Sequence, residues 1–123
     1  MPTVLLVEDN ELNRDMLSRR LERNGFSVSI AIDGEDGWNK ATQDLPDLIL
    51  MDVSLPKMDG LQLSRMLKAN GSTKHIPILV LTASAMDSDR DSALESGAED
   101  FDTKPIDLPR LLDKMRRLLN RNG

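Results

Sequence analysis

The chain has 123 residues, enough for one domain with its own hydrophobic core. Charged residues make up 30% and apolar residues 39% of it, a globular balance, and the net charge of −5 disfavours direct nucleic-acid binding. The absence of cysteine excludes disulfides and thiolate metal sites. We expect neither a membrane span nor a signal peptide, and hence a cytoplasmic protein.

Short apolar runs with β-type patterning alternate along the chain with longer segments of helical periodicity. In chain order, strands are predicted at "TVLLVED", "FSVSIAI", "LILM", "IPILVLT" and "EDFDT". Helices are predicted at residues 12–24, from Asp33 to just before Pro46, at residues 61–69 and 88–96, and from Asp107 onwards. In the first helix, we expect Leu12, Met16, Leu17 and Leu21 to form the buried side.

Five strand-then-helix units imply right-handed crossovers and a parallel sheet with helices on both faces. The apolar runs "VLLV", "LILM" and "ILVL" are typical of buried central strands, whereas the alternating "FSVSIAI" favours an edge position. We therefore predict a doubly wound α/β domain with a five-stranded parallel sheet. Periodicity leaves the strand order open, but the carboxyl ends of all strands share one edge, where ligands of such sheets bind.

Polar residues follow four of the predicted strands. They are Glu8 and Asp9 after the first strand, Asp52 after the third, Thr82 after the fourth, and Lys104 with Pro105 after the fifth. Carboxylates, a hydroxyl and an ammonium suit a magnesium ion and a phosphoryl group, with Asp9, Asp52 and the Ser54 carbonyl as candidate metal ligands. A carboxylate can also act as a nucleophile toward phosphorus, and Asp52 ends a rigid central strand.

Four segments, "LLVEDN", "DLILMDVSLPKMDG", "HIPILVLTA" and "GAEDFDTKPID", resemble in this order the receiver domain of two-component response regulators. The resemblance implies a flavodoxin-like (CheY-like) three-layer fold with strand order 2-1-3-4-5, and a single receiver domain over residues 1–123 without an output domain. It implies a phospho-accepting regulator, not an enzyme. The donor would be a sensor histidine kinase or a histidine phosphotransfer protein, in a reaction that depends on Mg²⁺.

The resemblance also implies a role for each site residue. Asp52 would be the phospho-acceptor. The metal ligands would be Asp9, Asp52 and the Ser54 carbonyl, with Glu8 as an indirect acidic ligand. Thr82 and Lys104 would contact the phosphate, Thr82 and the aromatic Phe101 would be the switch residues, and Pro105 would follow a cis bond. Phosphorylation would then change the surface formed by the fourth helix, the fifth strand and the last helix, which would bind a protein partner.

Two residues depart from the family pattern. Phe101 lacks the hydroxyl of the tyrosine that is frequent there, and Asp102 is acidic where an apolar residue is usual. The sequence offers no physical explanation for Asp102.

Other classes of function fit less well. An aspartyl-phosphate phosphatase usually needs a general acid near its nucleophile, and no second carboxylate lies two residues after Asp52. In a flavin-binding protein the acidic "VEDNELNRD" would repel the flavin phosphate, and aromatic residues, which could stack on the flavin ring, make up only 2% of the chain.

A binding module independent of phosphorylation remains an alternative. So does a simple helix-capping role for Asp9 or Asn10.

The charge is uneven along the chain. Residues 106–123 carry a net charge of +3 and the remainder carries −8. Arg110, Lys114, Arg117 and Arg121 would form a basic face on the last helix. This face indicates either a solvated helix surface or a contact for an acidic partner.

Overall fold

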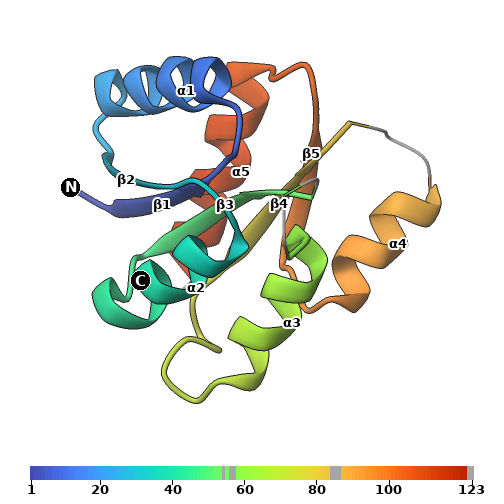
Figure 1. The fold of residues 1–123 in the computed structure, drawn as a ribbon. Coiled ribbons are helices and arrows are strands. Elements are labelled where there is room, and N and C mark those ends of the chain that lie inside the picture. The colour runs from blue at the N-terminus through green and yellow to red at the C-terminus, as the bar shows by residue number, and fades with distance from the viewer. Residues whose placement is uncertain (54, 56–57, 84–86, 122–123) are drawn as a thin grey trace.

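Strands and helices alternate in the computed structural model, which describes residues 1–53, 55, 58–83 and 87–121 (Figure 1). The strands are β1 (Thr3–Val7), β2 (Ser27–Ala31), β3 (Leu48–Asp52), β4 (Ile78–Thr82) and β5 (Asp100–Thr103). The helices are α1 (Glu11–Arg23), α2 (Gly34–Asp44), α3 (Gly60–Ala69), α4 (Asp87–Glu95) and α5 (Leu108–Arg121). Each predicted element is therefore present, with small shifts at its ends.

The five strands form one parallel sheet in the order β2-β1-β3-β4-β5. Helices α1 and α5 cover one face of the sheet, and α2, α3 and α4 cover the other (Figure 1). This is the predicted doubly wound, flavodoxin-like architecture. Among the described residues, no helix is both long enough and apolar enough to cross a membrane.

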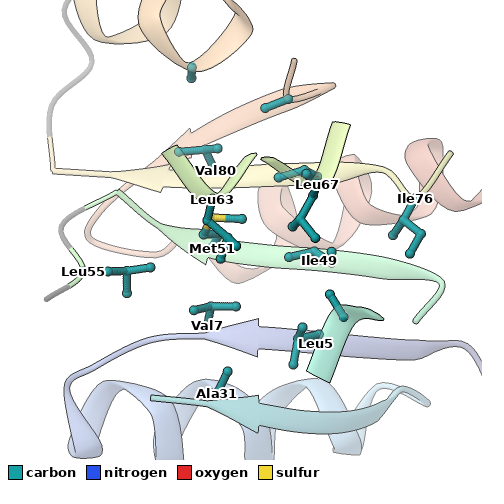
Figure 2. Packing of buried hydrophobic residues seen from close by; sticks show 14 residues of the cluster. Leu5, Val7, Ala31, Ile49, Met51, Leu55, Leu63, Leu67, Ile76 and Val80 are labelled. Carbon is teal, nitrogen blue, oxygen red and sulfur yellow. The ribbon is translucent and has the colours of Figure 1, made fainter. Parts of the chain in front are cut away.

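Alternating side chains of the central strands supply two cores. Leu5, Ile49 and Val80 point toward α2, α3 and α4, where they pack with Leu63 and Leu67 of α3 (Figure 2). Their sequence neighbours point to the opposite face and pack against α1 and α5. Because both faces of β1, β3 and β4 are buried, these strands need continuous apolar runs, which the sequence has.

Asp59 and Gly60 fix the start of α3 next to the end of β3. The Asp59 carboxylate accepts a hydrogen bond of 2.8 Å from the Gln62 amide and so caps the helix. A β-carbon at Gly60 would collide with the backbone carbonyl of Asp52. The glycine thus permits a close approach between the first turn of α3 and the strand end that carries Asp52.

The predicted buried side of α1 is partly wrong. Leu17 and Leu21 are buried, but Leu12 is 73% and Met16 is 53% exposed. The helix is oriented with Leu17 and Leu21 toward the sheet, where they pack in one cluster with Phe26. Leu12 and Met16 lie on the flank of the helix that remains open to solvent, so their i, i+4 spacing marks an apolar surface, whereas the same spacing of Leu17 and Leu21 marks core.

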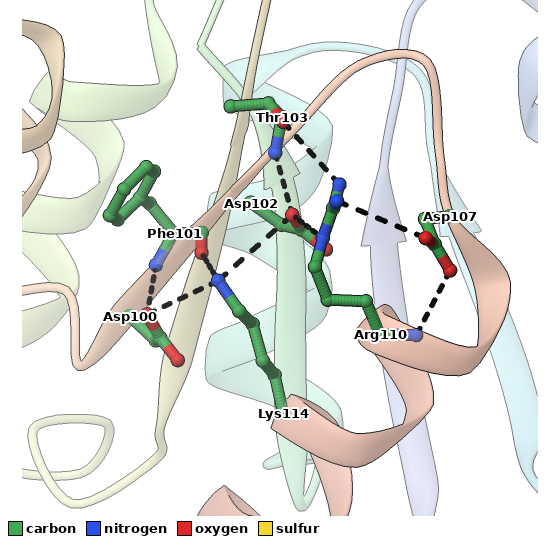
Figure 3. Close-up of polar contacts among 7 residues, drawn as sticks. All are labelled: Asp100, Phe101, Asp102, Thr103, Asp107, Arg110 and Lys114. Atoms are coloured by element: carbon green, nitrogen blue, oxygen red, sulfur yellow. Dashed lines mark hydrogen bonds and ion pairs between the residues drawn. The ribbon is translucent and has the colours of Figure 1, made fainter. Parts of the chain in front are cut away.

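Side chains cover the outer edge of β5. In a parallel strand, successive residues direct their backbone groups alternately to the two sides, and the Lys104 amide bonds to β4 through the Thr82 carbonyl. The outward-facing amide of Phe101 donates to Asp100 Oδ1, and that of Thr103 donates to Asp102 Oδ1, each at 2.8 Å (Figure 3). Lys114 Nζ donates to the outward-facing Phe101 carbonyl at 2.6 Å.

The other edge strand, β2, is covered in the same way by α2. The Ile32 amide donates to Asp36 Oδ2 at 3.0 Å, and Lys40 Nζ donates to the Ile30 carbonyl. Lys40 and Asp36 also form an ion pair of 3.4 Å. Each edge of the sheet therefore has backbone groups that bond to carboxylate and ammonium groups of the same chain.

Candidate functional site

The polar residues predicted at the strand ends meet at the carboxyl edge of the sheet, because all strands run in one direction. Glu8 directly follows β1, Asp52 ends β3 and Thr82 ends β4. All three are buried, with exposed fractions of 4%, 7% and 4%. Asp9, one residue further along, is exposed to solvent.

Three carboxylates form a compact group at this edge. Glu8, Asp9 and Asp52 each offer one oxygen, and these oxygens lie within 4.8 Å of one another. Two of the carboxylates are buried and one is open to solvent. Such a set of hard oxygen ligands, with one side accessible to water, is the donor type that Mg²⁺ prefers in proteins.

Lys104 bridges two of the acids. Its Nζ lies 2.7 Å from Asp52 Oδ2 and 3.2 Å from Glu8 Oε1. Lys104 directly follows β5, and its amide donates to the Thr82 carbonyl at 2.8 Å, which anchors the residue beside the end of β4. The peptide bond between Lys104 and Pro105 is cis.

The ionisation of this group reflects burial and like charge. Burial raises the pKa of Glu8 above the ordinary carboxyl value, and the nearby Asp52 carboxylate raises it further. For Lys104, burial alone would lower the pKa, but the hydrogen bond and charge of Asp52, joined by Glu8, raise it above 10.5. The ammonium therefore stays charged at neutral pH, whereas Glu8 binds a proton more readily than a solvated glutamate does.

The remaining candidate residues differ in what the structure shows of them. Ser54, a candidate carbonyl ligand, lies outside the described residues. Phe101 is half-buried on β5 and packs against the core beneath α3 and α4. The structure brings Glu8, Asp9 and Asp52 together with Lys104, and places Thr82 at the end of the strand next to β3.

A cavity of about 510 Å³ opens beside Lys104. It is lined by Glu8, Asn13, Met16, Leu17, Arg20, Leu81, Ala83, Lys104, Pro105 and Ile106. The wall is largely apolar, and Glu8 and Lys104 join it to the acidic group. Sequence reasoning missed this cavity because it counted Met16 as core; the solvent-facing flank of α1 depends on the rotation of the helix, which periodicity does not give.

The basic face predicted on the last helix is largely neutralised within the chain. Arg110 Nε bonds to Asp102 Oδ1 at 2.8 Å, Arg117 pairs with Asp113 at 2.6 Å, and Lys114 lies near two aspartates of β5. These pairs weaken the argument for a simple basic patch on α5.

Comparison with known proteins identifies the family. The family model for the response regulator receiver domain matches residues 4–116. The chain is 40% identical over 121 residues to the DNA-binding dual master transcriptional regulator RpaA of Synechocystis, covering 98% of this chain and 50% of that protein. It is 44% identical over 115 residues to the response regulator PleD of Caulobacter vibrioides, covering 94% of this chain and 25% of that protein. The chain thus spans 50% of the length of RpaA and 25% of the length of PleD.

Solved structures show the same fold over the whole chain. The receiver domain of the Francisella response regulator 1452 superposes with a TM-score of 0.93 at 25% identity and covers 100% of both chains. The receiver domain of a sensor histidine kinase from Pseudomonas aeruginosa PAO1, with magnesium coordinated in its active site cleft, gives 0.90 at 33% identity, covering 97% of this chain and 98% of the other. With the acidic group, the fold and these matches, the chain belongs to the response regulator receiver domains, the phospho-accepting modules of two-component signalling.

Proposed function

We propose that Asp52 accepts a phosphoryl group from a phosphohistidine of a partner protein, with Mg²⁺ bound beside it, and that the modified domain binds a further protein. The observation that carries the proposal is the contact of 2.7 Å between Lys104 Nζ and Asp52 Oδ2 inside a group of three carboxylates. A lone capping carboxylate has no need of such a partner.

Asp52 is the best nucleophile of the three acids. Glu8 has a raised pKa, so it carries a proton more readily, and a protonated carboxyl is a poor nucleophile. Asp9 is exposed, whereas Asp52 is held at the end of a central strand. In the transfer, an Asp52 oxygen forms a bond to phosphorus as the bond from phosphorus to the imidazole nitrogen breaks, and the nitrogen keeps the electron pair.

The oxygen ligands fit a divalent cation. Asp9 and Asp52 would hold Mg²⁺ directly, with the Ser54 carbonyl as a further ligand and Glu8 acting indirectly. Bound there, the cation would offset the negative charge of the acids and of the incoming phosphoryl group. The magnesium in the related Pseudomonas receiver domain supports this assignment.

Lys104 and Thr82 would contact the phosphoryl oxygens. The transferred group spreads negative charge over its equatorial oxygens, and preorganised donors stabilise that charge. Lys104 already donates to Asp52, and Thr82 ends the strand adjacent to β3. The phosphohistidine donor, a sensor histidine kinase or a histidine phosphotransfer protein, would approach along the apolar wall of the cavity beside Lys104.

The output would involve the α4-β5-α5 face. Thr82 would shift toward the phosphoryl group, and the ring of Phe101 would move into a more buried position on β5. Phe101 has no hydroxyl, so burial of its ring leaves no polar group without a partner. The Phe101 ring would thus exchange between its present position and a more buried one. The phosphoryl group can shift that equilibrium only by the difference in its affinity for the two arrangements.

Labelling with a small phosphodonor tests the acceptor. With acetyl phosphate and Mg²⁺, intact-mass analysis should show one added phosphoryl group, which Asp52→Asn should lack and the exposed control Asp44→Asn should retain. An excess of chelator, or Asp9→Ala, should slow the labelling. Full labelling of Asp52→Asn would refute the acceptor role, and rates indifferent to chelator would refute the role of the cation.

A further inference from the structure

The ammonium of Lys114 contacts Phe101 in two ways. It donates to the Phe101 carbonyl at 2.6 Å and lies 5.1 Å from the centroid of the Phe101 ring (Figure 3). An ammonium at this distance from an aromatic ring is attracted by the ring's quadrupole. Lys114 belongs to α5 and Phe101 to β5, so one side chain links the candidate switch residue to the neighbouring helix.

Two aspartates of β5 hold the ammonium in place. Lys114 Nζ lies 3.9 Å from Asp100 Oδ1 and 4.0 Å from Asp102 Oδ1. The Lys114 side chain is 21% exposed, so it is confined rather than extended into solvent. Figure 3 shows the ammonium among these groups, reached from α5 across the edge of β5.

Asp102 is a buried carboxylate with partners on both β5 and α5. The residue is 2% exposed, and its Oδ2 has no hydrogen-bond partner among the described residues. An apolar side chain would avoid the cost of burying this carboxylate. What the carboxylate does is bind Arg110 at 2.8 Å and the Thr103 amide at 2.8 Å, and keep a negative charge near Lys114.

We propose that Lys114 is a positioning residue for Phe101: held by Asp100 and Asp102, it keeps the Phe101 carbonyl and ring in their present half-buried position. Lys114 thereby opposes the more buried packing of the ring. This inference rests on the switch in the proposed function and adds a residue that restrains it. Loss of the Lys114 ammonium shifts the Phe101 ring toward the more buried packing, which is the packing that phosphorylation of Asp52 would favour.

The size of the effect follows from the strength of the contact. A partly exposed cation–ring contact changes an equilibrium by roughly two- to fivefold. While the buried packing is a minor population, apparent affinity for a phosphate mimic rises in proportion to that population. Lys114→Met is therefore expected to bind beryllofluoride, with Mg²⁺ present, about two- to fivefold more tightly than the parent.

The two phenylalanines of the chain make the ring directly observable. With fluorine-labelled phenylalanine, NMR gives one signal for Phe101 and one for Phe26, which is 3% exposed in the other core and serves as internal reference. Lys114→Met removes the charge and the donor, Lys114→Gln keeps a donor without charge, and Lys114→Arg keeps both. Arg116→Met, at an exposed position of α5, is the matched control for loss of one positive charge.

Without beryllofluoride, the Phe101 signal of Lys114→Met should move toward its position in the beryllofluoride-saturated parent. Lys114→Gln should move it less, and Lys114→Arg and Arg116→Met should leave it in place, with Phe26 constant throughout. An unmoved Phe101 signal in Lys114→Met, a displacement in the opposite direction, or an equal displacement in Arg116→Met would overturn the role of Lys114. A parent Phe101 signal that ignores beryllofluoride would instead overturn the switch itself, so the two failures are distinguishable.

Discussion

At the scale of single residues, the site depends on one ammonium among three carboxylates. Lys104 contacts both buried acids, and their charges keep its pKa above 10.5 although burial opposes this. A permanently charged lysine so close to Asp52 can stabilise a phosphoryl group without any change in its own protonation. It also reduces the repulsion between Glu8 and Asp52, which share a small volume.

Lys104→Met should separate these two effects. Loss of one preorganised donor to a transition state typically slows a reaction by roughly 100- to 1,000-fold, and we expect that loss for labelling by acetyl phosphate. Mg²⁺ binding, measured by calorimetry, should instead become tighter, because the acids lose a competing positive charge. Lys104→Arg should preserve much of both properties. Weaker Mg²⁺ binding in Lys104→Met would contradict this electrostatic account.

Glu8 makes the stability of the protein depend on pH in a defined direction. Its pKa is raised above 4.5 in the folded protein, so the folded state binds the proton more tightly than the unfolded chain does. The free energy of unfolding contributed by Glu8 therefore falls as pH rises from about 4.5 through the raised value. Glu8→Gln should be more stable than the parent at pH 7 without divalent cations, and should lose that advantage at low pH.

Urea unfolding over a pH series measures this difference. With Mg²⁺ present at pH 7, the parent should instead be more stable than Glu8→Gln, since the cation favours the ionised carboxylate that glutamine cannot supply. If Glu8→Gln is less stable than the parent at pH 7 in chelator, the charge of Glu8 does not lower the free energy of unfolding and this account is wrong.

Single residues also show where sequence reasoning stops. Asp52 and Lys104 were predictable, since the ends of parallel strands must converge at one edge. Asp102 was not, because its carboxylate bonds to Arg110 of α5 and to an amide on the outer edge of β5. That explanation needs the position of β5 in the sheet and the rotation of α5, neither of which follows from residue types.

At the scale of elements, the junction between β3 and α3 keeps Asp52 in position. Gly60 begins α3 at a point that leaves no room for a β-carbon beside the backbone carbonyl of Asp52. The Gly60 amide also donates to the Val53 carbonyl at 2.9 Å, which closes the connection between the two elements. The first turn of α3 therefore supports the residue that the proposed function phosphorylates.

Gly60→Ala should disturb this junction. The added methyl group would collide with the Asp52 carbonyl and lie 3.1 Å from Val53 Cα, and overpacking of this kind costs about 1–3 kcal/mol. Gly71→Ala is the control, because a β-carbon at Gly71 meets nothing within 4 Å. We expect urea unfolding to show the loss for Gly60→Ala alone, together with slower labelling of Asp52. Equal stability of the two variants would mean that the backbone relaxes freely there.

At the scale of the whole molecule, the proposed cation binding would be linked to folding. Glu8 and Asp9 follow β1 and Asp52 ends β3, so the carboxylates come together only when the sheet is formed. A cation that binds the folded state alone stabilises it by mass action. Mg²⁺ at one hundred times its dissociation constant should raise the free energy of unfolding by about 2.7 kcal/mol.

Chemical unfolding with and without Mg²⁺, at matched ionic strength, measures this gain. Asp9→Asn should lose most of it while keeping the stability of the parent in chelator, because Asp9 is exposed. A gain of equal size in Asp9→Asn would place the cation elsewhere.

The overall architecture was largely accessible from the sequence. Buried runs such as "LILM" in β3 identify central strands, and the alternation of strands with helices predicts a parallel sheet. Strand order came only from the family resemblance, because periodicity contains no information on which strands are neighbours. The exposed flank of α1 and the cavity beside it were missed, since an apolar stripe does not reveal which of its members face the sheet.

The covered margins of the sheet limit how this molecule can assemble. The edge of a sheet can pair with a strand of another chain only where its outward-facing amides and carbonyls have no partner. On β5 the Phe101 carbonyl already accepts a hydrogen bond from Lys114, and on β2 the Ile30 carbonyl accepts one from Lys40. Seeded aggregation followed with an amyloid dye should remain slow for the parent and accelerate when both lysines are replaced by methionine. For the parent, contact with another protein is therefore expected through helices and loops rather than by extension of its sheet into a second chain.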